Sequence, residues 1–154
     1  MDNDDVISTL NDLIETSKDG EEGFRTCAED ISDPQMRTLF ESRSQSCALA
    51  VTELQELVRS FGGDPQSRSS LSGTLHRRWI DIKSAITGKD DEAILSECER
   101  GEDVAVKNYR HALEKDLPAN VRSVVERQYN GVLRNHDQVR TLRDQIRTAK
   151  NLTR

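Results

Sequence analysis

The chain has 154 residues, of which 34% are hydrophobic and 32% are charged, and its formal net charge is −6. This length suits one domain, and the low apolar content is typical of long helices that each bury a narrow stripe. The negative charge argues against general binding to nucleic acid. No strongly alternating, β-branched run is present, no segment is suited to span a bilayer, and the opening residues do not resemble a signal peptide. We therefore expect an all-α protein with no membrane partner.

Three prolines divide the chain, because proline is poorly tolerated inside helices but suits their first turns and connections. They are Pro34, Pro65 and Pro118. The first helix is predicted over about residues 4–31 and the second over about 34–61, since apolar residues recur there at steps of three and four. The short link between them predicts antiparallel neighbours.

The segment between the second and third long helices exceeds the usual length of a bundle connection. Its apolar residues predict a short crossover helix over about 70–87: Leu71, Leu75, Trp79, Ile82 and Ile86. Two more long helices are expected over about 90–115 and 119–148. The prediction is one domain over residues 1–154, a four-helix bundle with a helical crossover between its halves.

The third long helix carries one carboxylate on its apolar stripe. Glu102 follows Cys98 by four residues and precedes Ala105 by three, so it faces inward with them. An inward carboxylate must be paired, hydrogen-bonded, metal-bound or protonated. Glu102 is therefore the strongest chemical signal in the sequence.

Four segments of the chain resemble a known family: LNDLIETSKDGEEGF, ELQELVRSFGGDP, LHRRWIDIKSAITGKDDEAILSECERGED and EKDLP. Together they resemble a bacterial four-helix-bundle family of unknown function that is grouped with the ferritin-like proteins. The resemblance runs from about Val6 to Ile146, and CERGED with the preceding TGKDDEAILSE is its most specific part. It implies a ferritin-like fold and says little about activity.

The ligand pattern of di-iron ferritin-like proteins includes two Glu-x-x-His motifs. Neither is present, because the residues three before the histidines are Gly73, Asn108 and Leu133. A reduced metal site for iron, manganese or zinc remains as one interpretation, with Glu21, Glu102 and His136 as ligands. The alternative is a Glu102–His136 hydrogen bond that satisfies two inward polar groups.

The three cysteines lie on apolar stripes and lack CxxC spacing, and their odd number predicts no disulfide framework. We therefore expect a reducing cytoplasm. Cys98 is the candidate redox thiol, if it contacts a protonated His136. Gly101 and Gly131 lie nearly opposite each other, which predicts close helix packing, with room for a ligand as the alternative.

Basic residues near the chain end are expected to form a solvated helix face, since acidic residues interrupt them and no aromatic platform accompanies them. Three functions stay open. The favoured one is a non-catalytic bundle that acts through self-association, as a homo-oligomer, or through a protein partner. The second is a metal-dependent redox or oxidative-stress protein that uses iron or manganese. The third is a binder of a small ligand in the bundle interior.

Overall fold

The computed structural model describes residues 1–65 and 88–152. Within these ranges the chain forms four helices and no strand: α1 (Asn3–Asp30), α2 (Pro34–Ser60), α4 (Asp91–Leu113) and α5 (Ala119–Leu152). The all-α, four-helix prediction is confirmed. The expected crossover helix over 70–87 lies outside the described residues. None of the four described helices is long and apolar enough to cross a membrane.

Aspartates begin three of the helices by accepting hydrogen bonds from backbone N–H groups that have no partner within the helix. Asp2 caps α1, Asp33 caps α2 and Asp90 caps α4. Asp91, the first residue of α4, also accepts hydrogen bonds from the backbone N–H groups of Ser32 (2.8 Å) and Asp33 (3.1 Å). The start of α4 is thereby fixed to the connection between α1 and α2.

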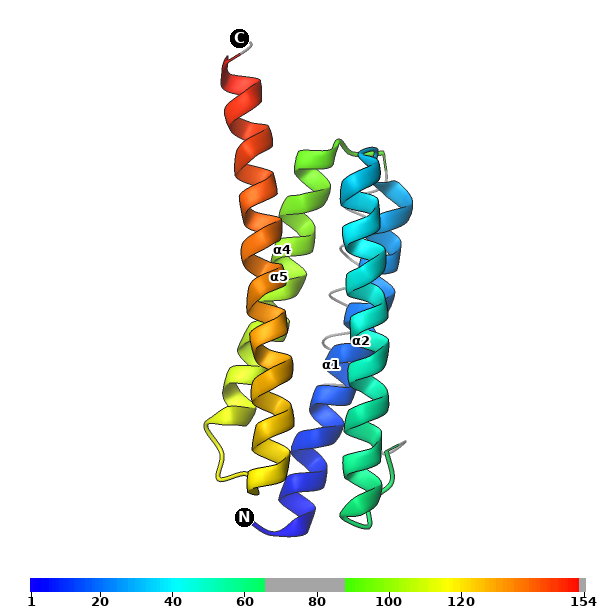
Figure 1. The fold of residues 1–154 in the computed structure, drawn as a ribbon, viewed down its shortest axis with the longest axis vertical. Helices are drawn as coiled ribbons and strands as arrows, with labels where there is room; N and C mark the ends of the chain where they lie inside the picture. The colour runs from blue at the N-terminus through cyan, green and yellow to red at the C-terminus, as the bar shows by residue number, and fades with distance from the viewer. Residues whose placement is uncertain (66–87, 153–154) are drawn as a thin grey trace.

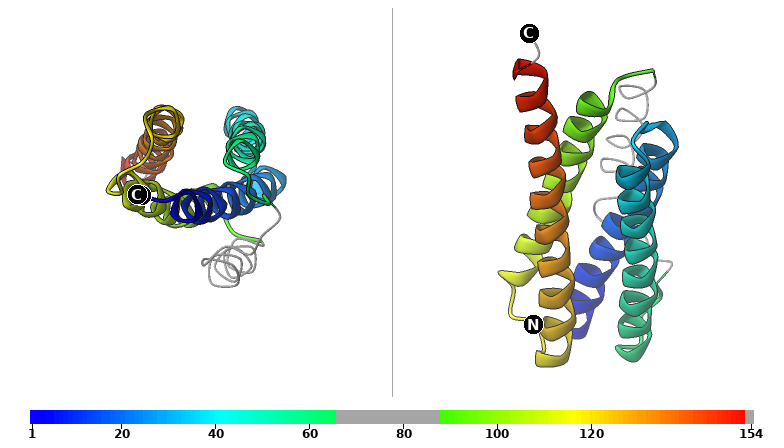
Figure 2. Two further views of the ribbon diagram at one scale, coloured as in Figure 1. Left: turned by 90° about the horizontal axis from the view of Figure 1, so that it is seen from below. Right: turned by 45° about the horizontal axis from the view of Figure 1, so that its top comes forward.

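The helices form two antiparallel pairs joined side by side. α1 packs along α2, α4 packs along α5, and α1 packs against α4 (Figure 1). α2 and α5 make few contacts with each other, and the end-on view of Figure 2 shows them standing apart above α1 and α4. One side of the bundle is therefore open.

The basic face of α5 pairs with acidic residues of α4. Arg143 contacts Glu99, Arg147 bonds Glu92 at 2.7 Å, and Lys150 bonds the same Glu92 at 3.0 Å. The sequence predicted that this helix ends at about residue 148, but α5 continues to residue 152. Its last turns make favourable contacts with the start of α4. The basic residues near the end of the chain therefore serve the packing of two helices.

A turn with positive φ ends α2 and provides a stability test. Gly62 has φ +80°, a conformation that costs other residues about 1–2 kcal/mol. Gly62→Ala should lower the free energy of unfolding by about 1 kcal/mol, measured by urea unfolding followed by circular dichroism. Gly131→Ala is the control, because it lies inside α5 where a Cβ would meet only the Arg134 guanidinium, at 3.8 Å. It should raise stability by up to about 1 kcal/mol. Equal effects of the two variants would contradict the assignment of the turn.

Candidate functional site

A groove of about 730 Å³ runs along the open side of the bundle, between α2 and α5. Residues of α1 and α4 form its floor. Its size falls within the range of about 300–1,000 Å³ that is usual for small-molecule sites. Small side chains on α2 help to make this space: Ser42, Ser46 and Ala50 recur every four residues and line the groove.

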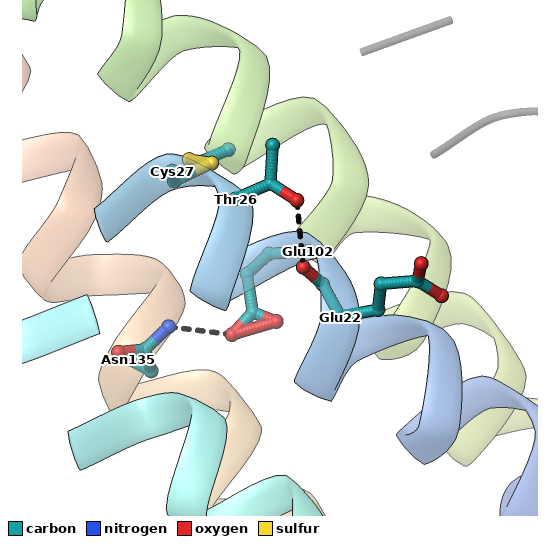
Figure 3. Close-up of a disulfide and its surroundings, with 6 residues drawn as sticks. Glu22, Thr26, Cys27, Glu102 and Asn135 are labelled. Atoms are coloured by element: carbon teal, nitrogen blue, oxygen red, sulfur yellow. Dashed lines mark hydrogen bonds between the residues drawn. A yellow bond between two sulfur atoms is a disulfide. The ribbon is translucent and has the colours of Figure 1, made fainter. Parts of the chain in front are cut away.

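Glu102 lies on the floor of the groove and is 1% exposed. Asn135 of α5 donates a hydrogen bond from Nδ2 to its Oε1 at 2.6 Å, as Figure 3 shows. Arg43 of α2 donates to the same oxygen from Nε at 3.3 Å. The carboxylate thus connects three helices, and the guanidinium of Arg43 balances its negative charge.

The pKa of Glu102 depends on its burial as well as on its contacts with Arg43 and Asn135. Burial raises the pKa of the Glu102 carboxyl, and the Arg43 cation and the Asn135 hydrogen bond act in the opposite direction. Arg43 itself is positioned over the ring of Phe24, with its central carbon 5.7 Å from the ring centroid. The guanidinium is therefore held by both a carboxylate and an aromatic face.

A second polar chain crosses the groove about two turns along α4. Tyr109 donates its hydroxyl hydrogen to Gln128 Oε1 at 2.8 Å and lies 3.1 Å from the Ser17 hydroxyl. Gln128 in turn donates to Glu53 of α2 at 2.8 Å, and Arg127 pairs with the other oxygen of Glu53. Burial raises the pKa of Tyr109 to about 12, so this hydroxyl is neutral at physiological pH.

Near Glu102, a disulfide joins Cys27 of α1 to Cys98 of α4 (Figure 3). This corrects two expectations: that the odd number of cysteines predicts no disulfide framework, and that Cys98 is a candidate redox thiol. The cysteine pattern also no longer favours a reducing compartment. Cys47 is the free cysteine among the described residues, and burial raises the pKa of its thiol to about 12.

The predicted metal ligands do not converge. His136 bonds Asp103 at 2.5 Å rather than Glu102, so the alternative Glu102–His136 hydrogen bond is also wrong. Glu21 offers its backbone carbonyl to Ser44, and its side chain makes no bond to Glu102 or His136. Within residues 1–65 and 88–152, no group of three or more His, Cys, Asp or Glu side chains could hold a metal ion.

The predicted close approach of helices at Gly131 is not found, because a Cβ there would meet no atom of α4 within 4 Å. Gly131 and Gly101 both line the groove instead. The alternative that these glycines leave room therefore agrees better with their positions.

Sequence reasoning missed Arg43 and Asn135 as partners of Glu102. Asn135 immediately precedes His136, and adjacent helical residues point about 100° apart, so the rotation of α5 about its axis decides which of the two faces Glu102. Arg43 gave no signal of its own, since arginine at the edge of an apolar stripe usually reaches solvent. The inward position of Glu102 implied a hydrogen-bond donor beside it, but the sequence did not identify the residue that donates.

Comparison with known proteins agrees with the fold. Residues 5–115 match the model of the domain of unknown function DUF2383. A dodecameric thioferritin, the bacterioferritin-related protein from Bacteroides fragilis, has a TM-score of 0.77 at 11% identity, covering 100% of this chain and 94% of that one. The DPS protein from Vibrio cholerae O1, described as a ferritin-like diiron-carboxylate protein, has a TM-score of 0.72 at 15% identity, covering 91% and 89%. No curated protein matches the chain. The predicted ferritin-like fold is confirmed, and so is the predicted match to a family of unknown function.

We expect the disulfide to contribute a large share of the free energy of unfolding. The two cysteines are 71 residues apart, and closing a loop of this size stabilises the folded state by about 4 kcal/mol in the chain-entropy model. The double variant Cys27→Ala/Cys98→Ala should lose about this free energy of unfolding. Cys47→Ala, which removes a buried cysteine outside the disulfide, is the matched control. A loss no larger than that of the control would count against the cross-link, as would three free thiols in unfolded, unreduced protein.

The raised pKa of Glu102 predicts a dependence of stability on pH. Unfolded glutamate has a pKa of about 4.3, so between this value and the raised pKa of the folded state the folded protein holds a proton that the unfolded chain has lost. The free energy of unfolding therefore falls as pH rises through the raised pKa, and Glu102→Gln abolishes this contribution. The melting temperature of the unmodified protein should fall relative to that of Glu102→Gln from about pH 4 upward. Glu126→Gln controls for the loss of one exposed charge. A difference that moves the opposite way would mean that Arg43, not burial, dominates.

Proposed function

Because the chain belongs to the DUF2383 family, whose fold alone defines no activity, we propose its function from the groove: it is a non-catalytic protein that binds a small organic ligand between α2 and α5. The supporting observation is a groove of about 730 Å³ with buried polar groups on its floor. Sites of this kind combine apolar walls with a few fixed polar groups, and helical bundles often form them between helices.

The chemistry of the floor supports binding rather than catalysis. Cys47 and Tyr109 are both neutral at physiological pH, since burial raises the pKa of each to about 12. Glu102 is engaged by Arg43 and Asn135. A nucleophile or general base needs a pKa near the working pH and an accessible lone pair. Cys47 and Tyr109 do not meet the first condition, and Glu102 already accepts two hydrogen bonds at Oε1.

A metal-dependent redox function with iron or manganese fits the residues poorly. The resembling structures include a ferritin-like diiron-carboxylate protein, as its description states. In this chain the guanidinium of Arg43 takes the position beside Glu102 that a cation would need, and His136 is held by Asp103. We therefore derive no chemical step through a metal.

Self-association is a second candidate, favoured by one observation. Leu49 lines the groove at the edge of α2 and remains 72% exposed, although large apolar side chains are usually covered. A second copy of the chain laid over the groove would cover it in a homo-oligomer. The thioferritin of similar fold is described as a dodecamer.

Filling the groove tests the first proposal. A neutral fluorescent probe, N-phenyl-1-naphthylamine, should bind the purified protein in a saturable manner, with one site per chain. Ala50→Trp places an indole in the groove and should weaken binding at least tenfold. Ala149→Trp makes the same change on the exposed end of α5 and should leave binding unchanged. Equal binding by both variants would contradict the groove as the site.

Light scattering after size exclusion tests the second candidate. If a copy covers Leu49, the purified protein should be oligomeric and Leu49→Asp should shift it toward monomer, because an ionised carboxylate resists burial. Leu152→Asp, at the other large exposed apolar side chain of the helices, is the matched control. A strictly monomeric parent protein would remove this candidate and leave ligand binding intact.

A further inference from the structure

The hydrogen-bonding groups of Arg43 are only partly used. A guanidinium has five N–H donors in a fixed fork. Arg43 donates from Nε to Glu102, and its terminal amino groups make no hydrogen bond or ion pair with any of the described residues. The side chain lines the groove and keeps 13% of its surface exposed.

The position of this fork is fixed before any ligand arrives. Glu102 holds the Nε edge, and the central carbon of the guanidinium lies over the Phe24 ring. Arginine forks bind carboxylates through two parallel hydrogen bonds, and a fork that is already held loses less freedom on binding. Arg43 therefore has the geometry of a receptor for a planar anion.

The other charges of the groove favour an anion over a cation. Glu102 is engaged by Arg43, and Glu53 is engaged by Arg127 and Gln128. Arg134 also lines the groove and makes no ion pair within the described part of the chain. A cationic ligand would find both carboxylates already neutralised, whereas an anion finds arginine donors that are still available.

The α2 wall around Arg43 combines apolar side chains with the small polar side chains of Ser42 and Ser46. Leu39 lies one turn before Arg43, and Leu49 and Ala50 lie about two turns after it, all of them lining the groove. These side chains extend over about 16 Å of helix, at 1.5 Å per residue. That length matches an extended apolar body of moderate size.

We propose that the groove binds a small amphipathic carboxylate, whose headgroup accepts hydrogen bonds from the terminal amino groups of Arg43 and whose apolar body lies along α2 toward Leu49. This inference rests on the proposed function and names its ligand class. A single negative charge fits better than a dianion, because the Glu102 carboxylate shares the same guanidinium.

Three ligands of equal chain length test the headgroup: decanoate, decan-1-ol and decylammonium. Each is titrated into the full-length protein below its micellar concentration, by displacement of N-phenyl-1-naphthylamine and by calorimetry. Decanoate should bind at least tenfold more tightly than the alcohol and the ammonium ion. A tenfold difference corresponds to about 1.4 kcal/mol, which a charge-assisted hydrogen bond can supply.

Substitution of Arg43 tests the receptor. Arg43→Gln should reduce decanoate affinity at least tenfold and leave decan-1-ol affinity unchanged. Arg100→Gln, on the exposed face of α4, is the matched control and should have no effect. Because Arg43→Gln leaves Glu102 without its cation, the double variant Arg43→Gln/Glu102→Gln removes both charges and gives the same readout if the single variant fails to fold.

The outcomes separate this inference from the proposed function. Equal binding of decanoate and decan-1-ol, or decanoate binding that survives both Arg43 variants, overturns the carboxylate class but leaves the groove as a binding site. Failure of all three ligands and of the neutral probe overturns both. Selective decanoate binding that Arg43→Gln abolishes supports both.

Discussion

The architecture depends on how a nearly inaccessible carboxylate is accommodated. Leaving Glu102 ionised without partners in the bundle interior would cost several kcal/mol. Arg43 and Asn135 instead approach it from α2 and α5, the two helices that make few contacts with each other. The interaction therefore joins the two separated walls of the groove through a residue on its floor. It also fixes the position of a mostly buried guanidinium that lines the groove.

Polar crossings take the place of apolar packing along this open side. The buried apolar residues form two clusters toward the two ends of the bundle, one around Phe24 and Phe40 and the other around Leu10 and Leu54. Between α2 and α5, the connections run through Glu102 and through the Glu53–Gln128 bond. Hydrogen bonds of this kind require fixed spacing but do not fill space. The walls can thus be held at a distance that leaves a groove between them.

The sequence predicted the parts of this arrangement that depend on local rules. Proline positions marked the breaks between helices, and the spacing around Glu102 placed it correctly in the interior. It did not predict the partners, because these depend on helix rotation: Asn135 faces Glu102 where His136 was expected, and His136 turns to Asp103. The Cys27–Cys98 disulfide was missed for a similar reason, since cysteine number says nothing about which pairs meet across 71 residues.

The identity of the cation beside a buried carboxylate determines what kind of chemistry a bundle can support. A metal ion offers open coordination positions and polarises what it binds. A guanidinium cannot lose its proton at physiological pH and presents only hydrogen-bond donors in a plane. With Arg43 beside Glu102, the centre of this ferritin-like bundle offers fixed donors and no group that titrates near neutrality among Cys47, Tyr109 and Arg43. Such a centre selects ligands by shape and charge, and its specificity follows from the unused half of one arginine side chain.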